Sequence, residues 1–225
     1  MPKHIWIIMD WNRRWAKQRL LPSIAWHKAW ADNVKKIVNH SITKWITHIT
    51  MWALYKDNLK KRDKKEVEWI IKLINNIESF LWDMFADNVR FETIWNIEEL
   101  PLESQKILNN VKEKTKGNTW ITLILALIYW WQDEIIRATK KIIKSGMNPD
   151  NLSSEEYRKF TDTGKFPIVD LIIRTWWDIR HSWFMLFDSE YSEYYFTDKK
   201  WPEFNYIELD KAIDSFKWSK RNFWK

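Results

Sequence analysis

The segment 121–129, with the sequence ITLILALIY, is apolar apart from Thr122 and does not alternate with polar residues. A strand with one face in water alternates between apolar and polar side chains, so a continuous apolar strand is expected to be covered on both faces. Such strands are typical of parallel sheets, whose crossover helices lie on both sides. The segment therefore predicts a buried parallel sheet.

Strand-like and helix-like segments alternate along the rest of the chain. Short apolar runs predict strands at 4–9, 46–54, 89–94, 171–174 and 194–197, and apolar residues at helical spacing predict helices over 27–42, 67–84, 102–114, 207–217 and from 132 onward. This order predicts an α/β fold: a single domain, residues 1–225, with a central, mostly parallel β-sheet flanked by helices. Ligands of such sheets gather beyond the carboxyl ends of the strands. The charged segment 56–68 is interpreted as a mobile loop, not as a hinge between domains.

Charge and composition limit the function only broadly. The chain has 37 Lys and Arg against 30 Asp and Glu, a net charge of +7 that suits nucleic acid, anionic lipid or phosphorylated small molecules equally well. It has no cysteine, which excludes disulfides and thiolate metal sites and is compatible with the cytoplasm. The longest apolar run, 121–131, is too short for a bilayer span of about 20 residues. We expect no signal peptide and no membrane-spanning segment.

The first motif that carries chemistry is the segment 4–19, HIWIIMDWNRRWAKQR. An apolar strand brings Asp10 to its end, and Asn12, Arg13 and Arg14 then open a helix. A carboxylate beside two guanidiniums and the amides of a helix start can bind Mg²⁺ and a diphosphate together. Taken alone, the segment is explained equally well by an Asp N-cap followed by solvated arginines.

Two further segments are polar in a regular way. Residues 53–62, ALYKDNLKKR, read as a basic loop, which alone would be an ordinary solvated segment. Residues 170–204 contain Arg174, Arg180 and Ser182, which can form a fork for a diphosphate because its oxygens accept charge-assisted hydrogen bonds.

Together these segments resemble the cis-prenyltransferases of the undecaprenyl diphosphate synthase type, in family order through nearly the whole chain. The family pattern H-x-x-I-I-M-D-G-N-x-R-W-A is matched from His4 to Ala16, G-H-x-x-G at 26–30, and D-L-x-I-R-T-G-G-x-x-R-x-S-x-F from Asp170 onward. The loop F-S-x-E-N is matched at 54–58, with Tyr55 for Ser and Asp57 for Glu. A fourth match, 127–138, has Ile128 where the family has Asn.

The resemblance implies a role for each matched residue. It implies Asp10, Asn58 and Arg62 as catalytic residues, with Lys61 competing with Arg62, and Mg²⁺ on Asp10 and Glu193, the latter supplied across a dimer interface. It implies substrate binding by Trp11, Asn12, Arg13, Arg14, Trp15, Ser23, His27, Tyr55, Lys56, Asp57, Leu59, Arg174, Arg180, His181 and Ser182. Ser23 stands where some members have an Arg on the diphosphate, for which Arg19 is a candidate substitute.

The activity implied is a Mg²⁺-dependent condensation of isopentenyl diphosphate with an allylic prenyl diphosphate, of which farnesyl diphosphate is the expected example. The product would be a cis-polyprenyl diphosphate whose tail occupies an apolar tunnel. The resemblance also implies a homodimer. We expect peripheral membrane contact, because the product is apolar, and no nucleic-acid partner. Two alternatives stay open: a catalytically dead prenyltransferase-like subunit, and a basic protein that binds nucleic acid or anionic surfaces.

Tryptophan is abnormally common and glycine abnormally rare. The chain has 19 Trp and 3 Gly, whereas average usage predicts roughly 16 glycines. Tryptophan stands at nine positions where the family has glycine: Trp11, Trp26, Trp30, Trp45, Trp95, Trp130, Trp131, Trp176 and Trp177. Our hypothesis is that the host reads one codon, such as UGA, as glycine, and that this codon has been translated as tryptophan at these positions. The chain with glycine at these nine positions is called the glycine form below.

Overall fold

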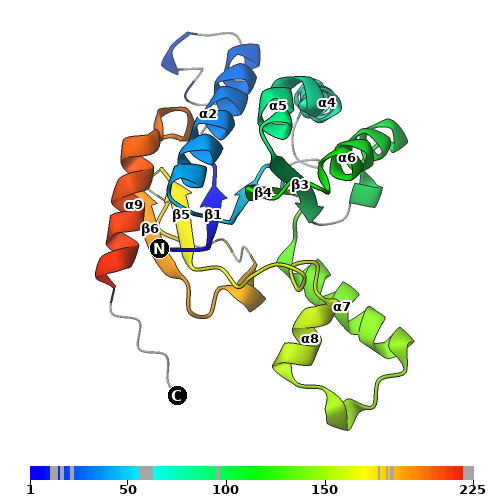
Figure 1. The fold of residues 1–225 in the computed structure, drawn as a ribbon. Coiled ribbons are helices and arrows are strands. Elements are labelled where there is room, and N and C mark those ends of the chain that lie inside the picture. Colours follow the sequence, from blue (N-terminus) through cyan, green and yellow to red (C-terminus); the bar gives the residue numbers. More distant parts are fainter. Residues whose placement is uncertain are drawn as a thin grey trace.

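The computed structural model describes residues 1–10, 15, 18–20, 23–55, 63–94, 97–176, 178–180, 182 and 185–219, and at 23–27 it describes the backbone only. Six strands form one sheet: β1 (His4–Ile8), β2 (His48–Trp52), β3 (Val89–Ile94), β4 (Ile121–Ala126), β5 (Leu171–Thr175) and β6 (Glu193–Thr197). Their order is β3-β4-β2-β1-β5-β6, and every pair is parallel (Figure 1). The predicted α/β fold is confirmed.

Helices connect the strands and cover the sheet (Figure 1). They are α2 (Ser23–Thr43), α4 (Lys64–Asn75), α5 (Ile77–Ala86), α6 (Leu102–Thr115), α7 (Trp131–Ser145), α8 (Ser154–Phe160) and α9 (Tyr206–Trp218), with short 3₁₀ turns η1 (Ile97–Glu99), η2 (Pro149–Asn151), η3 (Leu186–Asp188) and η4 (Trp201–Glu203). Among the residues that the structure describes, no helix is both long enough and apolar enough to cross a bilayer.

Two sequence predictions need correction. The stretch 67–84 is not one helix, because Asn76 interrupts it and donates its side-chain amide to the Lys72 carbonyl. Asparagine competes with the helical backbone in this way. The charged segment 56–68 is not all loop, since α4 begins at Lys64 and the Asp63 carboxylate caps it by accepting from the Lys65 amide at 2.9 Å. Residues 56–62 lie outside the described residues.

The sheet buries both of its faces, as its apolar strands predict. In β1, the side chains of Ile5 and Ile7 join the larger core, to which α2, α4, α5, α6 and α9 contribute. Trp6 and Ile8 point the other way, into a smaller cluster with Tyr129 and residues between α8 and β5. The strand that delivers the first candidate site residue, Asp10, is therefore packed on both sides.

The helix α7 carries one buried carboxylate, Glu134. Glu134 is 3% exposed, and its Oε1 accepts a hydrogen bond from the Asp162 amide at 3.2 Å. Burial, together with the nearby carboxylates of Asp162 and Asp188, raises the pKa of Glu134 to about 8. The folded state therefore holds a proton on Glu134 that the unfolded chain releases above its ordinary pKa of 4.5.

This pKa predicts a pH dependence of stability. Because the folded state binds the extra proton, the free energy of unfolding should fall as the pH rises from about 4.5 to 8, by several kcal/mol at about 1.4 kcal/mol per pKa unit. Glu134→Gln keeps the acceptor oxygen but cannot ionise, so its loss over this range should be smaller. Urea unfolding of both proteins at several pH values measures the difference. The prediction would be contradicted if the free energy of unfolding of the two proteins changed equally with pH.

Candidate active site

Asp10 and Arg174 meet where two central strands end. Asp10 follows β1, Arg174 lies at the end of β5, and the pairing of the strands sets Arg174 beside Ile8. The Arg174 guanidinium binds Oδ2 of Asp10 through Nε at 2.8 Å and through Nη2 at 2.7 Å. The Asp10 side chain is 28% exposed and that of Arg174 only 5%, so the carboxylate faces solvent from a buried support.

Thr175 fixes the backbone at this point. Its hydroxyl accepts from the Asp10 amide at 2.9 Å and donates to the Ile8 carbonyl at 3.2 Å. The side chain is fully buried. It thereby gives the Ile8 carbonyl and the Asp10 amide a hydrogen-bond partner and fixes the backbone of Asp10.

Arg174 also reaches the segment that follows β5. Its Nη1 donates to the hydroxyl of Ser182 at 2.6 Å and to the carbonyl of Arg180. Asp178 lies between the two guanidiniums, with Oδ2 at 2.9 Å from Nη2 of Arg180 and at 3.5 Å from Nη2 of Arg174. The structure therefore brings Asp10, Arg174, Arg180 and Ser182 into one cluster.

The charges in this cluster can receive an anion. The Arg180 side chain is 63% exposed, so its guanidinium is accessible to a ligand, and guanidiniums bind phosphate oxygens through paired hydrogen bonds. Burial raises the pKa of Asp10 above its ordinary value, and the adjacent Arg174 opposes the rise. A cation or a second guanidinium beside Asp10 would favour its charged form.

The chain matches known proteins over nearly its full length. The family model described as "Putative undecaprenyl diphosphate synthase" matches residues 8–224. An isoprenyl transferase from Treponema denticola is 40% identical over 98% of this chain and 95% of that protein. A (2E,6E)-farnesyl-diphosphate-specific ditrans,polycis-undecaprenyl-diphosphate synthase from Micrococcus luteus is 37% identical over 99% of this chain and 91% of that protein. The chain belongs to the undecaprenyl diphosphate synthase family of cis-prenyltransferases.

Solved structures of similar proteins have the same fold. Lavandulyl diphosphate synthase from Lavandula x intermedia, in complex with dimethylallyl diphosphate, superimposes with a TM-score of 0.92 at 28% identity, over 98% of this chain and 97% of that one. A probable undecaprenyl diphosphate synthase from Campylobacter jejuni gives a TM-score of 0.84 at 26% identity, over 100% and 99% of the two chains. The fold of this isoprenyl transferase family therefore extends over the whole chain.

Asp10 is chemically suited to Mg²⁺. It is an accessible oxygen donor, and protein Mg²⁺ sites commonly combine one or two carboxylates with phosphate oxygens of the substrate. Among the described residues there is no cluster of three or more acidic, His or Cys side chains that could hold a metal ion. Glu193 is the first residue of β6 and pairs with Leu171 of β5, which in turn pairs with Ile5 of β1. Glu193 therefore lies at the opposite end of the sheet from Asp10, which follows β1. The separation is about 16 Å along the strands, so one chain does not bring these two carboxylates together.

The structure also describes Tyr55, Trp15 and Arg19 from these segments. Tyr55 follows β2 and forms an isolated bridge with Tyr129. Trp15 packs against the larger core, and the guanidinium of Arg19 lies 4.7 Å from its ring centre. Arg19 also pairs with Glu203 at 2.8 Å.

Several predicted residues cannot be located within the site. Ser23 and His27 belong to α2, but only the backbone is described there. The predictions for Trp11, Asn12, Arg13, Arg14, Lys56, Asp57, Asn58, Leu59, Lys61, Arg62 and His181 lie outside the described residues.

Sequence reasoning did not assign site roles to Thr175 and Asp178. Thr175 is the threonine of the motif that begins at Asp170, and its contact with Asp10 depends on the pairing of β1 with β5. Asp178 is four residues beyond Arg174 in the same motif, so its acidic side chain between two arginines was an available signal. Both residues act on the geometry of the guanidiniums and the carboxylate.

The role of Thr175 leads to a measurable prediction. Thr175→Val keeps the shape of the side chain but leaves the Asp10 amide and the Ile8 carbonyl without this partner. The free energy of unfolding should fall by about 1–3 kcal/mol. Chemical denaturation measures the loss. The control is Thr43→Val, at an exposed hydroxyl that donates to the His40 carbonyl. Equal effects of the two changes would contradict the role given to Thr175.

Proposed function

We propose that this chain condenses isopentenyl diphosphate with an allylic prenyl diphosphate to form a cis-polyprenyl diphosphate of the undecaprenyl type. The observation that carries the proposal is the cluster of Asp10, Arg174, Arg180 and Ser182 at the carboxyl ends of parallel strands. Family membership supports the reaction class. Residues 1–225 would form a single catalytic domain.

The diphosphate of isopentenyl diphosphate would bind Arg174, Arg180 and Ser182. Support comes from the contacts of Arg174, which already hold the Ser182 hydroxyl and the Arg180 backbone in place. The donors of Arg174 are occupied by Asp10, Asp178, the Arg180 carbonyl and the Ser182 hydroxyl, so a diphosphate would replace some of these acceptors. Its charged oxygens would form stronger hydrogen bonds with the guanidinium than a carbonyl or a hydroxyl does.

The allylic diphosphate would bind beside it, at Asn12, Arg13, Arg14 and His27, with its tail in an apolar tunnel. The expected allylic substrate is farnesyl diphosphate. The name of the Micrococcus luteus relative, which is specific for that compound, supports this choice. The bound dimethylallyl diphosphate of the Lavandula structure supports an allylic diphosphate site in this fold.

Asp10 would hold Mg²⁺, with Glu193 contributed by a second copy in a homodimer. The position of Glu193 at the far end of its own sheet supports a contribution from another copy. The ion would supply stabilisation of the charge on the departing diphosphate. Peripheral membrane contact is proposed because the product is apolar, and the cytoplasm is the proposed location. No nucleic-acid partner is proposed.

The reaction then depends on how the chain orients the two substrates. The double bond of isopentenyl diphosphate attacks the carbon that carries the allylic diphosphate, the carbon–oxygen bond breaks, and a proton leaves the isopentenyl unit. Asn58 is proposed to assist the removal of that proton, and Arg62 to neutralise the leaving diphosphate. The cis geometry follows from the orientation of the bound substrates.

Incorporation of labelled isopentenyl diphosphate, with farnesyl diphosphate as primer, tests the proposal in the glycine form. Product should form with Mg²⁺ and not with excess chelator. Asp10→Asn should lower kcat/KM by about 10²-fold or more, because stabilisation of developing charge is commonly worth this much.

Asp214→Asn is the matched control, because Asp214 is an exposed aspartate on α9 that pairs with Lys217. Its activity should equal that of the parent. Absence of any condensation product from the folded glycine form would contradict the enzymatic proposal. Full activity of Asp10→Asn would contradict the role of Asp10.

A further inference from the structure

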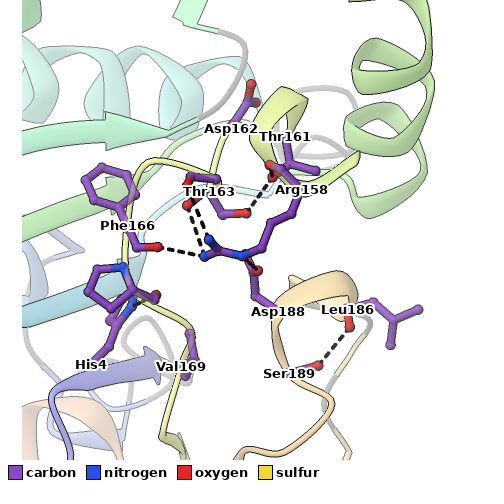
Figure 2. A network of polar contacts seen from close by, with 12 residues as sticks. His4, Arg158, Thr161, Asp162, Thr163, Phe166, Val169, Leu186, Asp188 and Ser189 are labelled. Carbon is purple, nitrogen blue, oxygen red and sulfur yellow. Dashed lines mark hydrogen bonds and ion pairs between the residues drawn. The ribbon is translucent and has the colours of Figure 1, made fainter. Parts of the chain in front are cut away.

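Arg158 on α8 binds two separate segments of the chain (Figure 2). Its Nε donates to Oδ1 of Asp188 at 2.6 Å, and its two terminal nitrogens donate to backbone carbonyls at 2.7 Å (Phe166), 3.2 Å (Gly164) and 3.5 Å (Thr163). Asp188 is 3% exposed. One guanidinium thus holds a carboxylate and a tight loop together.

In the sequence, one of these segments precedes and the other follows the residues of the proposed isopentenyl diphosphate site. The loop 163–166 comes shortly before β5, which carries Arg174, and Asp188 comes shortly after Ser182. A second contact secures the same region, because the Tyr129 hydroxyl accepts from the Met185 amide at 2.5 Å. The contacts of Arg158 therefore secure the chain both before Arg174 and after Ser182.

The backbone near Ser182 needs such support. Ser182 has φ 49° and Met185 has φ 47°, in the left-handed region that residues with a β-carbon seldom adopt. Conformations of this kind persist where surrounding contacts determine them. The Asp188–Arg158 pair and the Tyr129 hydroxyl are contacts of that kind.

We propose that Arg158 is a positioning residue for the binding of isopentenyl diphosphate. It does not touch the cluster of Asp10, Arg174, Arg180 and Ser182; it holds the loop before β5 and Asp188, six residues after Ser182. This inference rests on the proposed function, since it assigns the second diphosphate to those residues. It adds a requirement that comes from α8, a helix without a motif residue.

The test is a double variant of the glycine form, Arg158→Met with Asp188→Leu. Replacing both partners by apolar side chains avoids leaving a buried charge alone, which is the main cost of a single change. The KM for isopentenyl diphosphate should rise about tenfold, because small displacements of binding groups have effects of this order or larger. The KM for farnesyl diphosphate should stay within about twofold of the parent value.

The control removes an ion pair between α5 and α6, with Lys114→Met and Glu78→Leu; the pair is 2.6 Å long. This control should change neither the KM for isopentenyl diphosphate nor the KM for farnesyl diphosphate.

The proposal would be overturned if the folded Arg158→Met/Asp188→Leu variant had an unchanged KM for isopentenyl diphosphate, or if the KM values for both substrates rose equally. If that variant does not fold, Arg158→Lys is tested instead. Lysine can pair with Asp188 but cannot hold the three carbonyls, so the KM for isopentenyl diphosphate should rise several-fold. No condensation by the parent would instead contradict the proposed function.

A different observation, on two tryptophans, carries a second inference. Trp45 follows α2 with φ 60°. Its amide donates to the Ile42 carbonyl at 3.0 Å, and the next amide, of Ile46, donates to the Ser41 carbonyl at 3.2 Å. This is the Schellman ending of a helix, whose left-handed residue is usually glycine.

The chain uses glycine where α7 ends in a left-handed residue. Gly146 has φ 68° and donates its amide to the Ile143 carbonyl at 3.3 Å. Gly164 also fits only glycine, because a β-carbon there would lie 2.1 Å from the Arg158 carbonyl oxygen. Glycine therefore still occupies positions that demand it elsewhere in the chain.

Trp176 is the second such tryptophan. It has φ 69° directly after β5, between the strand that carries Arg174 and the segment that carries Arg180. Other residues with side chains also have positive φ: Leu20, Asn88, Ile128, Ser182 and Met185. Ile128 and Met185 are at most 1% exposed and held by packing, whereas the Trp45 side chain is 86% exposed. Packing thus gives no reason for an indole at position 45.

Two other tryptophans have the surroundings expected of that residue. Trp6 and Trp201 are fully buried, and their indole nitrogens donate to His4 and to the Trp30 carbonyl, respectively. These four tryptophans therefore differ: Trp6 and Trp201 are buried and hydrogen-bonded, whereas the backbone at Trp45 and Trp176 favours glycine.

We infer that the organism inserts glycine at positions 45 and 176. The left-handed backbone at both positions and the 19 Trp against 3 Gly carry this inference. A single reassigned codon would account for both residues and for the shortage of glycine.

The gene and the natural protein test this inference together. The codons for residues 45 and 176 should be identical to each other and different from the codon for Trp201, and peptide masses from the native protein should show glycine at 45 and 176. One shared codon for all three residues, or tryptophan masses at 45 and 176, would overturn it. In the recombinant chain, Trp45→Gly should raise the thermal midpoint and Trp201→Gly should lower it.

Discussion

The ion pair between Asp10 and Arg174 is the contact on which the candidate site depends. It exists because β1 and β5 are adjacent and parallel, so that their carboxyl ends deliver a carboxylate and a guanidinium to the same point. Thr175 fixes the backbone there, and burial on both faces of β1 keeps the strand in place. The remaining polar contacts of the cluster extend outward from Arg174.

The sequence allowed much of this arrangement to be predicted. The apolar run 121–129 predicted a sheet buried on both faces, and the alternation of elements predicted its parallel strands. The motifs named Asp10, Arg174, Arg180 and Ser182 as site residues, and the structure places these four residues close together. Their signal is strong because each polar residue ends or follows an apolar strand, where parallel topology leaves few alternatives.

Other features could not be predicted because they depend on contacts distant in sequence. The helix α8 is too short for a helical pattern of apolar residues to be recognised in the sequence. Its Arg158 nevertheless binds both the loop before β5 and Asp188. The division of the 67–84 stretch at Asn76 depends on a local side-chain hydrogen bond. The register of β6 against β5, which sets Glu193 at the opposite end of the sheet from Asp10, is also visible only in the fold. The backbone adds information that the residue types alone lack, most clearly at Trp45 and Trp176.

A crystal structure of the glycine form with Mg²⁺ and an unreactive analogue of isopentenyl diphosphate is the most direct measurement of the central contact. The diphosphate should lie within hydrogen-bond distance of Arg174, Arg180 and Ser182, and the Asp10 carboxylate should face the ion. A diphosphate bound elsewhere, with Asp10 and Arg174 paired as before and no ion beside them, would contradict the assignment of this cluster as the active site.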